Sequence, residues 1–126
     1  MALMDKLQIP VGVYGIGDVI YIQFKFDDST KSKPRPAIII DYDETQTRVI
    51  VLKVTTKQVR TMFDYPVQNP EQANLKEGSV VRCNHILTLP NEFKCKHHGR
   101  LARQDELAIR LLYNQALQAN ALVDAT

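Results

Sequence analysis

The stretch DVIYIQFKF, residues 18–26, carries the clearest folding signal in the chain. Its apolar side chains alternate with Tyr, Gln and Lys, and the apolar positions are Ile20, Ile22, Phe24 and Phe26. A period of two is typical of a β-strand that buries one face and exposes the other. Gly15 and Gly17 come just before this stretch and permit a turn there. The sequence therefore predicts a β-strand over 18–26.

Further strands are predicted downstream, where runs rich in Val, Ile, Leu and Thr recur. In chain order they are 37–42, 48–55, one within 58–67, and 79–82 with 86–89, which form one strand or two pieces around Asn84. The intervening segments contain Pro, Gly, Asn, Asp, Lys and Ser and are predicted to be loops: 27–34, 43–46 and 69–78.

The C-terminal part of the chain changes character. Residues 103–121 contain no Pro or Gly, and apolar residues recur there at helical spacing. Asp105 and Glu106 favour the positive N-terminal end of a helix, whereas Ala102 is a poor N-cap. Several short strands followed by one helix predict a mainly β (α+β) domain, in which a C-terminal α-helix packs on a small, antiparallel, barrel-like sheet.

Size and composition suit a single globular domain. The chain has 126 residues, of which 44% are hydrophobic and 24% charged, as in ordinary globular proteins. No apolar run reaches the roughly 18 residues that a membrane span requires. Residues 1–10 lack the basic start and apolar stretch of a signal peptide. We expect a cytoplasmic protein that does not associate with membranes.

Two cysteines, Cys83 and Cys95, are too few for a disulfide framework and are expected to be free thiols. Each lies close to histidine, in the segments CNH (83–85) and CKHH (95–98). Thiolates and imidazoles suit zinc, but this spacing is tighter than that of the usual zinc motifs. We therefore expect no metal and no cofactor.

Basic residues are clustered, although the formal net charge is only +2. Lys31, Lys33 and Arg35 lie within five residues of one another, and the stretch 94–103 carries four Lys or Arg residues, two His and no acid. Such clusters either line an anion-binding face or are solvated loop residues. Charge alone does not decide between these two interpretations.

Two short motifs place polar residues at the ends of predicted strands. In KPRP (33–36), two prolines hold Arg35 in an extended backbone, where its guanidinium can grip a phosphate or cap the strand. VTTK (54–57) ends another strand with hydroxyl groups that can bind a phosphate oxygen or serve only as strand residues.

A third motif, VVRCNH (80–85), interrupts an apolar run with polar side chains. Because side chains alternate along a strand, Arg82 and Asn84 are expected on one face and Cys83 and His85 on the other. The motif is interpreted as a compact polar site or as a paired structural arginine.

Together, these motifs resemble the PemK/MazF/Kid family of type II toxin–antitoxin toxins. The matching pieces are GDVI (17–20), RP (35–36) before an apolar strand, TT (55–56) at a strand end and GSVVRCN (78–84). Their order and spacing make the resemblance fairly specific. It defines a toxin domain at 17–122, an N-terminal extension at 1–16 without a counterpart, and a frayed tail at 123–126.

The resemblance implies an SH3-like antiparallel β-barrel with a C-terminal helix that forms a homodimer. It implies a toxin that cuts single-stranded RNA, such as mRNA, at short sequences without a metal ion, through attack of the ribose 2′-hydroxyl on the adjacent phosphate. It also implies a cognate antitoxin that lays a disordered segment over the RNA groove. A gyrase poison belongs to the same fold family, but no residue here points to one, and DNA binding by the toxin alone is not expected.

Residue roles follow from the resemblance as well. Arg35 would bind the scissile phosphate, Thr55 would orient it, and Arg82 would stabilise its charge. Asn84 lies where one branch of the family has an aspartate that acts as general base. Further residues expected to contact RNA are Lys31, Lys33, Thr56, Lys57, Phe63 and His85.

Asn84 leaves the general base unassigned, because an amide takes no proton at neutral pH. Loss of a general base costs on the order of 10²–10⁴ in rate. Three alternatives stay open. In the first, a bulge turns His85 toward Arg82, where it acts as the base. In the second, which is the preferred interpretation, the chain follows the MazF branch, which relies on the Arg and Thr pair. In the third, the chain is a catalytically weak module that binds RNA or an antitoxin.

Overall fold

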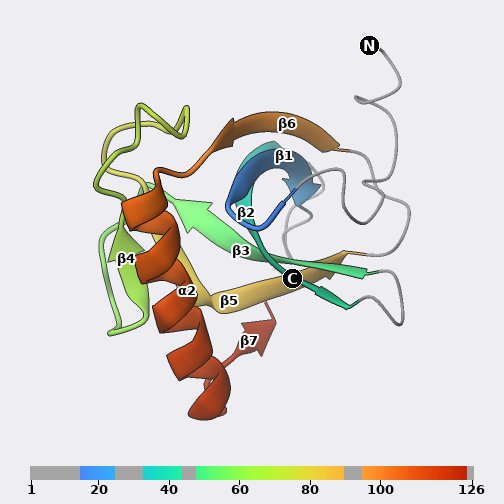
Figure 1. The fold of residues 1–126 in the computed structure, drawn as a ribbon, viewed down its shortest axis with the longest axis vertical. Helices are drawn as coiled ribbons and strands as arrows, with labels where there is room; N and C mark the ends of the chain where they lie inside the picture. Colours follow the sequence, from blue (N-terminus) through green and yellow to red (C-terminus); the bar gives the residue numbers. More distant parts are fainter. Residues whose placement is uncertain (1–14, 25–32, 44–47, 90–94, 125–126) are drawn as a thin grey trace.

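The computed structural model describes residues 15–24, 33–43, 48–89 and 95–124 (Figure 1). These residues form seven strands and one helix. In chain order they are β1 (Asp18–Phe24), β2 (Lys33–Asp43), β3 (Arg48–Thr55), β4 (Asp64–Pro66), β5 (Val80–Leu89), β6 (Cys95–Arg100), α2 (Arg103–Gln118) and β7 (Val123–Asp124).

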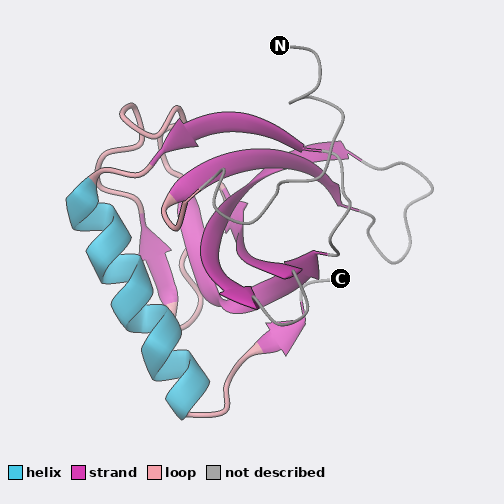
Figure 2. Cartoon of the chain, turned by 45° about the vertical axis from the view of Figure 1, so that its right-hand side comes forward, coloured by secondary structure: helices cyan, strands magenta, loops and turns pink. Residues whose placement is uncertain are grey.

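The strands build one curled sheet. Their order is β4-β5-β3-β2-β1-β6, every neighbouring pair is antiparallel, and the short β7 pairs in parallel with β5. The sheet bends around on itself, and α2 lies outside it beside β4 and β5 (Figures 1 and 2). Within the described residues no ladder joins β4 to β6, so the barrel is open on that side. The predicted mainly β, barrel-like sheet with one C-terminal helix is confirmed.

Apolar side chains divide into two clusters on the two faces of the sheet. In the first, Leu52 and Val81 of the sheet pack with Ile109 and Tyr113 of α2. The second cluster comprises Ile20, Ile22, Ala37, Ile39, Val49, Val51, Leu89 and Cys95. Burying one such Val, Leu or Ile side chain contributes roughly 1.5–3 kcal/mol. Burial on both faces explains why 37–40 is a continuous apolar run and not an alternating one.

Three β-bulges bend the strands and change the faces on which side chains lie. Ile40 is the extra residue of β2 against β3, and His98 is the extra residue of β6 against β1. The largest irregularity is in β5, where residues 83–85 have no partner on β3: Lys53 pairs with Arg82, and the next pair joins Leu52 to Ile86. A bulge re-aims the side chains at and beyond it.

Asp105, in the first turn of α2, is completely buried and fastens the helix to the segment after β4. Its carboxylate accepts a hydrogen bond from the Tyr65 hydroxyl at 2.6 Å, and from the backbone N–H groups of Gln68 and Asn69 at 3.1 and 2.9 Å. No side chain caps the helix at Ala102, in line with the poor N-cap that the sequence predicts.

Some elements differ from the sequence-based expectation. The polar stretch that contains β6 was not predicted as a strand, because its composition lacks apolar alternation; it forms the edge of the sheet, where polar residues are tolerated. The strand expected within 58–67 has only three residues, and Val80–Leu89 forms one continuous strand. The short β7 lies beyond Leu122, the predicted end of the domain, in the segment assigned to a frayed tail. No helix in the described part of the chain has the length and apolar character to cross a membrane.

Gly99 permits the close approach of β6 to the turn at Ala73. A Cβ on Gly99 would lie 2.3 Å from the Ala73 carbonyl oxygen, a backbone atom that cannot rotate aside. We expect Gly99→Ala to lower the free energy of unfolding by about 1–3 kcal/mol, as other overpacking substitutions do. The matched control is Gly15→Ala, since a Cβ there has its nearest neighbour at 3.8 Å. Urea unfolding measures both, and equal midpoints for the two variants would contradict this packing.

Candidate functional site

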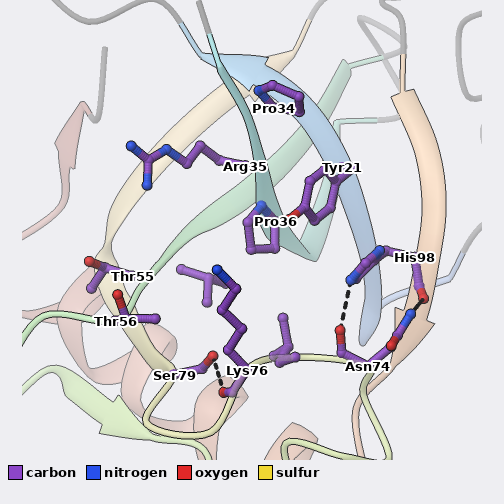
Figure 3. Close-up of a pocket in the computed structure, with 12 residues that line it drawn as sticks. Tyr21, Pro34, Arg35, Pro36, Thr55, Thr56, Asn74, Lys76, Ser79 and His98 are labelled. Carbon is purple, nitrogen blue, oxygen red and sulfur yellow. Dashed lines mark hydrogen bonds between the residues drawn. The ribbon is translucent and has the colours of Figure 1, made fainter.

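Two adjoining pockets open where β2, β3 and β5 converge. We name the smaller, of about 150 Å³, the cationic pocket and the larger, of about 460 Å³, the aromatic pocket. Arg35, Val54 and Thr55 line both, so the two pockets adjoin each other. Arg35 extends from between Pro34 and Pro36 of β2, as the KPRP motif predicts (Figure 3).

The cationic pocket gathers basic side chains from three strands and one loop. They are Arg35, Lys53, Lys57, Arg60, Arg82 and the imidazole of His85. None of the residues that line it carries a carboxylate. Such a concentration of positive charge in a small hollow favours a bound anion, and guanidinium groups are suited to phosphate oxygens.

The pKa of Lys53 reflects the positive field of this pocket. Burial lowers the pKa of its ammonium group. Four neighbouring cations lower the pKa of Lys53 further, in the order Arg82, Lys57, Arg35 and Arg60. The cations that line the pocket therefore act on Lys53 electrostatically. The fold brings these side chains together although they are up to 47 positions apart in the sequence.

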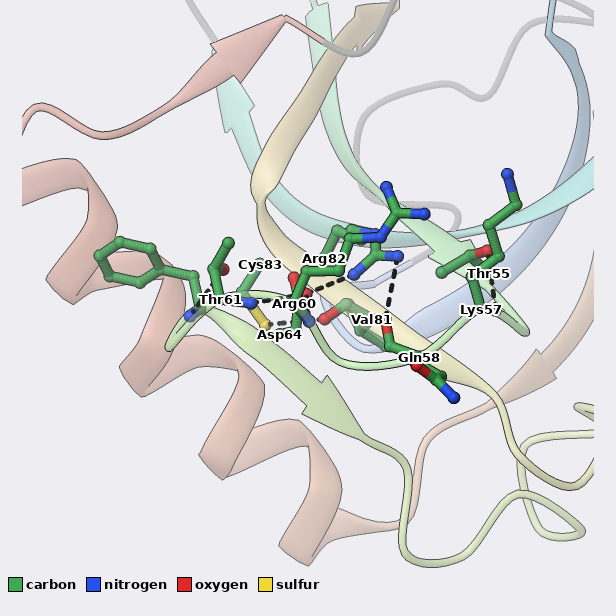
Figure 4. Close-up of polar contacts among 10 residues, drawn as sticks. Thr55, Lys57, Gln58, Arg60, Thr61, Asp64, Val81, Arg82 and Cys83 are labelled. Atoms are coloured by element: carbon green, nitrogen blue, oxygen red, sulfur yellow. Dashed lines mark hydrogen bonds and ion pairs between the residues drawn. The ribbon is translucent and has the colours of Figure 1, made fainter.

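Arg82 is buried and held in place by an ion pair with Asp64 (Figure 4). Its Nη2 also donates to the backbone oxygen of Gln58 at 3.2 Å. Oδ2 of Asp64 accepts two further hydrogen bonds, from the backbone N–H of Arg60 at 2.8 Å and of Thr61 at 3.2 Å. One carboxylate thus orients the guanidinium and folds the loop before β4 around it.

His85 lines the cationic pocket beside Arg82, contrary to the alternation predicted for the VVRCNH segment. That prediction is wrong because the bulge at 83–85 breaks the period of two. Burial lowers the pKa of His85, and the charges of Lys53 and Arg82 lower it further, while Asp64 opposes them. Its imidazole is therefore neutral at neutral pH and able to accept a proton.

Asn84 and Cys83, the neighbours of His85, lie away from both pockets. Asn84 is buried, and its Nδ2 donates to the backbone oxygen of Ala121 at 3.3 Å, after the end of α2. The expected shared face of Arg82 and Asn84 is therefore absent. Cys83 lies in the cluster under α2, where burial raises the pKa of its thiol to about 12. Such a thiol is inert.

The other residues predicted to contact RNA have mixed positions. Thr56 lines the aromatic pocket, and Lys57 lines the cationic one while its backbone N–H donates to Oγ1 of Thr55 at 3.2 Å. Phe63 lines neither pocket. Lys31 falls outside the described residues, and Lys33 begins β2 with its side chain likewise outside them.

Several lining residues were not predicted: Tyr21, Lys53, Arg60, Lys76 and His98. Lys53 left a signal in the sequence as a charge within the apolar strand 48–55, and His98 belongs to the basic stretch 94–103. Tyr21 lies on the predicted strand β1, Arg60 and Lys76 lie in loops, and His98 lies on β6, which was not predicted. In the part of the chain that the structure describes, no three His, Cys, Asp or Glu side chains gather closely enough to hold a metal ion. Cys83 and Cys95 belong to different apolar clusters.

The fold and the family of the chain follow from comparison with known proteins. Among solved structures the chain is similar to MazF (Form-I) from Deinococcus radiodurans, with a TM-score of 0.63 and 16% identity over 84% of this chain and 97% of that one. It is also similar to an endoribonuclease in complex with its cognate antitoxin from a mycobacterial species, with a TM-score of 0.60 and 17% identity over 82% and 93% of the two chains. At such identities the likeness is one of fold.

No sequence among curated proteins matches the chain. The model of the PemK-like, MazF-like toxin family of type II toxin–antitoxin systems matches residues 16–115, which include every described residue that lines the two pockets. The chain therefore belongs to the PemK-like, MazF-like toxins of type II toxin–antitoxin systems.

Proposed function

We propose that this chain is a sequence-specific endoribonuclease that cuts single-stranded RNA, mRNA included, without a metal ion. The observation that carries the proposal is the cationic pocket, in which Arg35, Thr55 and Arg82 surround one small volume beside a neutral imidazole. A phosphodiester fits such a volume by charge, and the imidazole fits the proton that the reaction must remove. The names of the similar structures, MazF and endoribonuclease, agree with this chemistry.

Binding of the scissile phosphate is assigned to Arg35, Thr55 and Arg82. Arg35 pairs its guanidinium N–H groups with the non-bridging oxygens. Oγ1 of Thr55 already accepts a hydrogen bond from Lys57, so its O–H donates to the phosphate. Arg82, fixed by Asp64, supplies positive charge where negative charge develops in the transition state.

Removal of the 2′-hydroxyl proton is assigned to His85. The 2′ oxygen then attacks phosphorus, and the bond from phosphorus to the 5′ oxygen breaks, which leaves a 2′,3′-cyclic phosphate and a 5′-hydroxyl. The departing 5′ oxygen takes a proton from the ammonium of Lys53, which is a stronger acid than an ordinary lysine because its pKa is lowered. Asn84 has no part in these steps.

Asp64 does not serve as the base, although it is the carboxylate nearest to Arg82. Its Oδ2 is engaged by Arg82 and by two backbone N–H groups. Its Oδ1 is buried without a hydrogen-bond partner among the described residues and lines neither pocket. We therefore assign Asp64 the role of positioning Arg82.

Partners and setting follow from the family. We propose that a cognate antitoxin covers the cationic pocket with a segment that carries acidic side chains, as the charge of the pocket favours. We also propose that the toxin domain at 17–122 forms a homodimer and acts in the cytoplasm on mRNA.

Removal of Arg35 tests the phosphate site. In excess EDTA, the wild-type protein is expected to cut a long single-stranded RNA at one short sequence. Arg35→Ala is expected to cut it about 10²–10³-fold more slowly, the usual loss for one donor to transition-state charge. Arg48→Ala is the charge-matched control, because Arg48 is exposed at the opposite end of β3 and lines neither pocket.

Mapped fragment ends and single-turnover rates give the result. Loss of cutting in EDTA, or equal rates for Arg35→Ala and the wild type, would sink the proposal. Intact RNA that nevertheless binds to folded wild-type protein would favour the alternative of a catalytically weak RNA-binding or antitoxin-binding module.

The pH dependence of cutting tests His85. Because its pKa is lowered from 6.5, the neutral base predominates at neutral pH, and the rate is expected to fall only as acidification protonates it. His85→Gln should lose this acid limb and about 10²–10⁴ in rate. The control is His97→Gln, since His97 lines neither pocket. An unchanged rate and acid limb in His85→Gln would rule out this base.

A further inference from the structure

The aromatic pocket has no part in the chemical steps, yet it adjoins the scissile phosphate site. It shares Arg35 and Thr55 with the cationic pocket and has about three times its volume, 460 against 150 Å³. Its volume lies within the range of small-molecule sites, roughly 300–1,000 Å³. A nucleotide bound there would be next in the RNA strand to a phosphate held by Arg35.

One wall of this pocket is an aromatic pair. The rings of Tyr21 and His98 lie 4.4 Å apart between centroids and are tilted by 37°. Pro36 lies beside Tyr21, so the wall is extended by a flat apolar surface (Figure 3). Rings presented in this way are the usual platforms on which bases of single-stranded RNA stack.

The position of His98 is fixed by the backbone. His98 is the extra residue in the bulge of β6, which turns its ring toward Tyr21. Its Nε2 lies 2.7 Å from the backbone oxygen of Asn74, and Nδ2 of Asn74 donates to the His98 backbone oxygen at 3.0 Å. A carbonyl oxygen only accepts, so Nε2 is the donor in this hydrogen bond. Gly99 allows this close approach to the turn at 73–74.

The remaining lining is polar. Lys76 extends from the loop before β5 toward Pro36 (Figure 3), and Thr56 also lines the pocket. Oγ of Ser79 donates to the Lys76 backbone oxygen at 2.6 Å, which holds the base of that loop. A flat apolar wall opposite a few hydrogen-bonding groups matches a nucleobase, which has two π faces and a polar edge.

We infer that the aromatic pocket binds the nucleobase that flanks the scissile phosphate, and that Tyr21, His98 and Lys76 set the base preference at that position. This inference rests on the proposed ribonuclease function. An RNA base is favoured over an antitoxin side chain because the pocket combines a ring platform with lining residues, Arg35 and Thr55, that it shares with the phosphate site.

Coupling between protein and RNA variants tests the inference. The probe is the RNA oligonucleotide that the wild type cuts, made resistant by a 2′-deoxy nucleotide at the cut and carrying an abasic nucleotide at each flanking position in turn. For the wild type, one abasic position is expected to weaken binding by about 5- to 150-fold, the range for loss of one stacked base. For His98→Ala and Tyr21→Leu, the same abasic position should cause no further loss.

His97→Ala is the control, because His97 is the exposed neighbour of His98 outside the pocket, and it should respond as the wild type does. In cutting assays, His98→Ala and Tyr21→Leu should relax the preference at that one position. Wild-type cutting without any coupling would overturn the subsite alone, as would variants that weaken only antitoxin inhibition. Protein that neither cuts nor binds RNA would overturn the proposed function together with the subsite.

Discussion

Residues 83–85 of β5 form a bulge, since they have no pairing partner on β3. Both the core and the site depend on this bulge. Before the bulge, Val81 packs under α2; after it, Leu89 packs in the other cluster. Unpaired backbone groups in a buried strand are costly, and here other elements pair with them. The Cys83 N–H donates to the backbone oxygen of Phe63 at 3.0 Å, and β7 pairs with β5 at His85 and Ile86. The short strands β4 and β7 are thus the supports of the bulge.

Positive charge is gathered at this point at a cost in stability. Two unit charges about 4 Å apart repel by about 1 kcal/mol in water and about 4 kcal/mol near a protein surface. One buried carboxylate, Asp64, offsets part of that repulsion, and burial of the two apolar clusters stabilises the fold against it. A bound polyanion would offset the repulsion that is left. Stability and binding at this site are therefore linked, and both depend on ionic strength.

Much of the fold could be predicted from the sequence, but only part of the site. Alternation of apolar residues revealed β1, and the apolar runs revealed β2 and β3, because burial of whole faces leaves a pattern over many residues. The two prolines around Arg35 identified its position correctly, since they fix the backbone locally. The orientation of His85 was not predictable, because a bulge depends on the pairing of two strands distant in sequence. For the same reason the polar edge strand β6 was not predicted, and His98 was noted only as part of the basic stretch 94–103.

The field that would bind phosphate also contributes to the protonation state of His85. Burial lowers the pKa of the His85 imidazole, and the charges of Lys53 and Arg82 lower it further, which keeps it deprotonated at neutral pH. A bound phosphodiester adds one negative charge and so weakens that effect. The pKa of His85 would then rise toward neutrality, where an imidazole is most effective as a base. Arrival of the substrate would thus strengthen the base that acts on it, and this coupling needs no carboxylate at position 84.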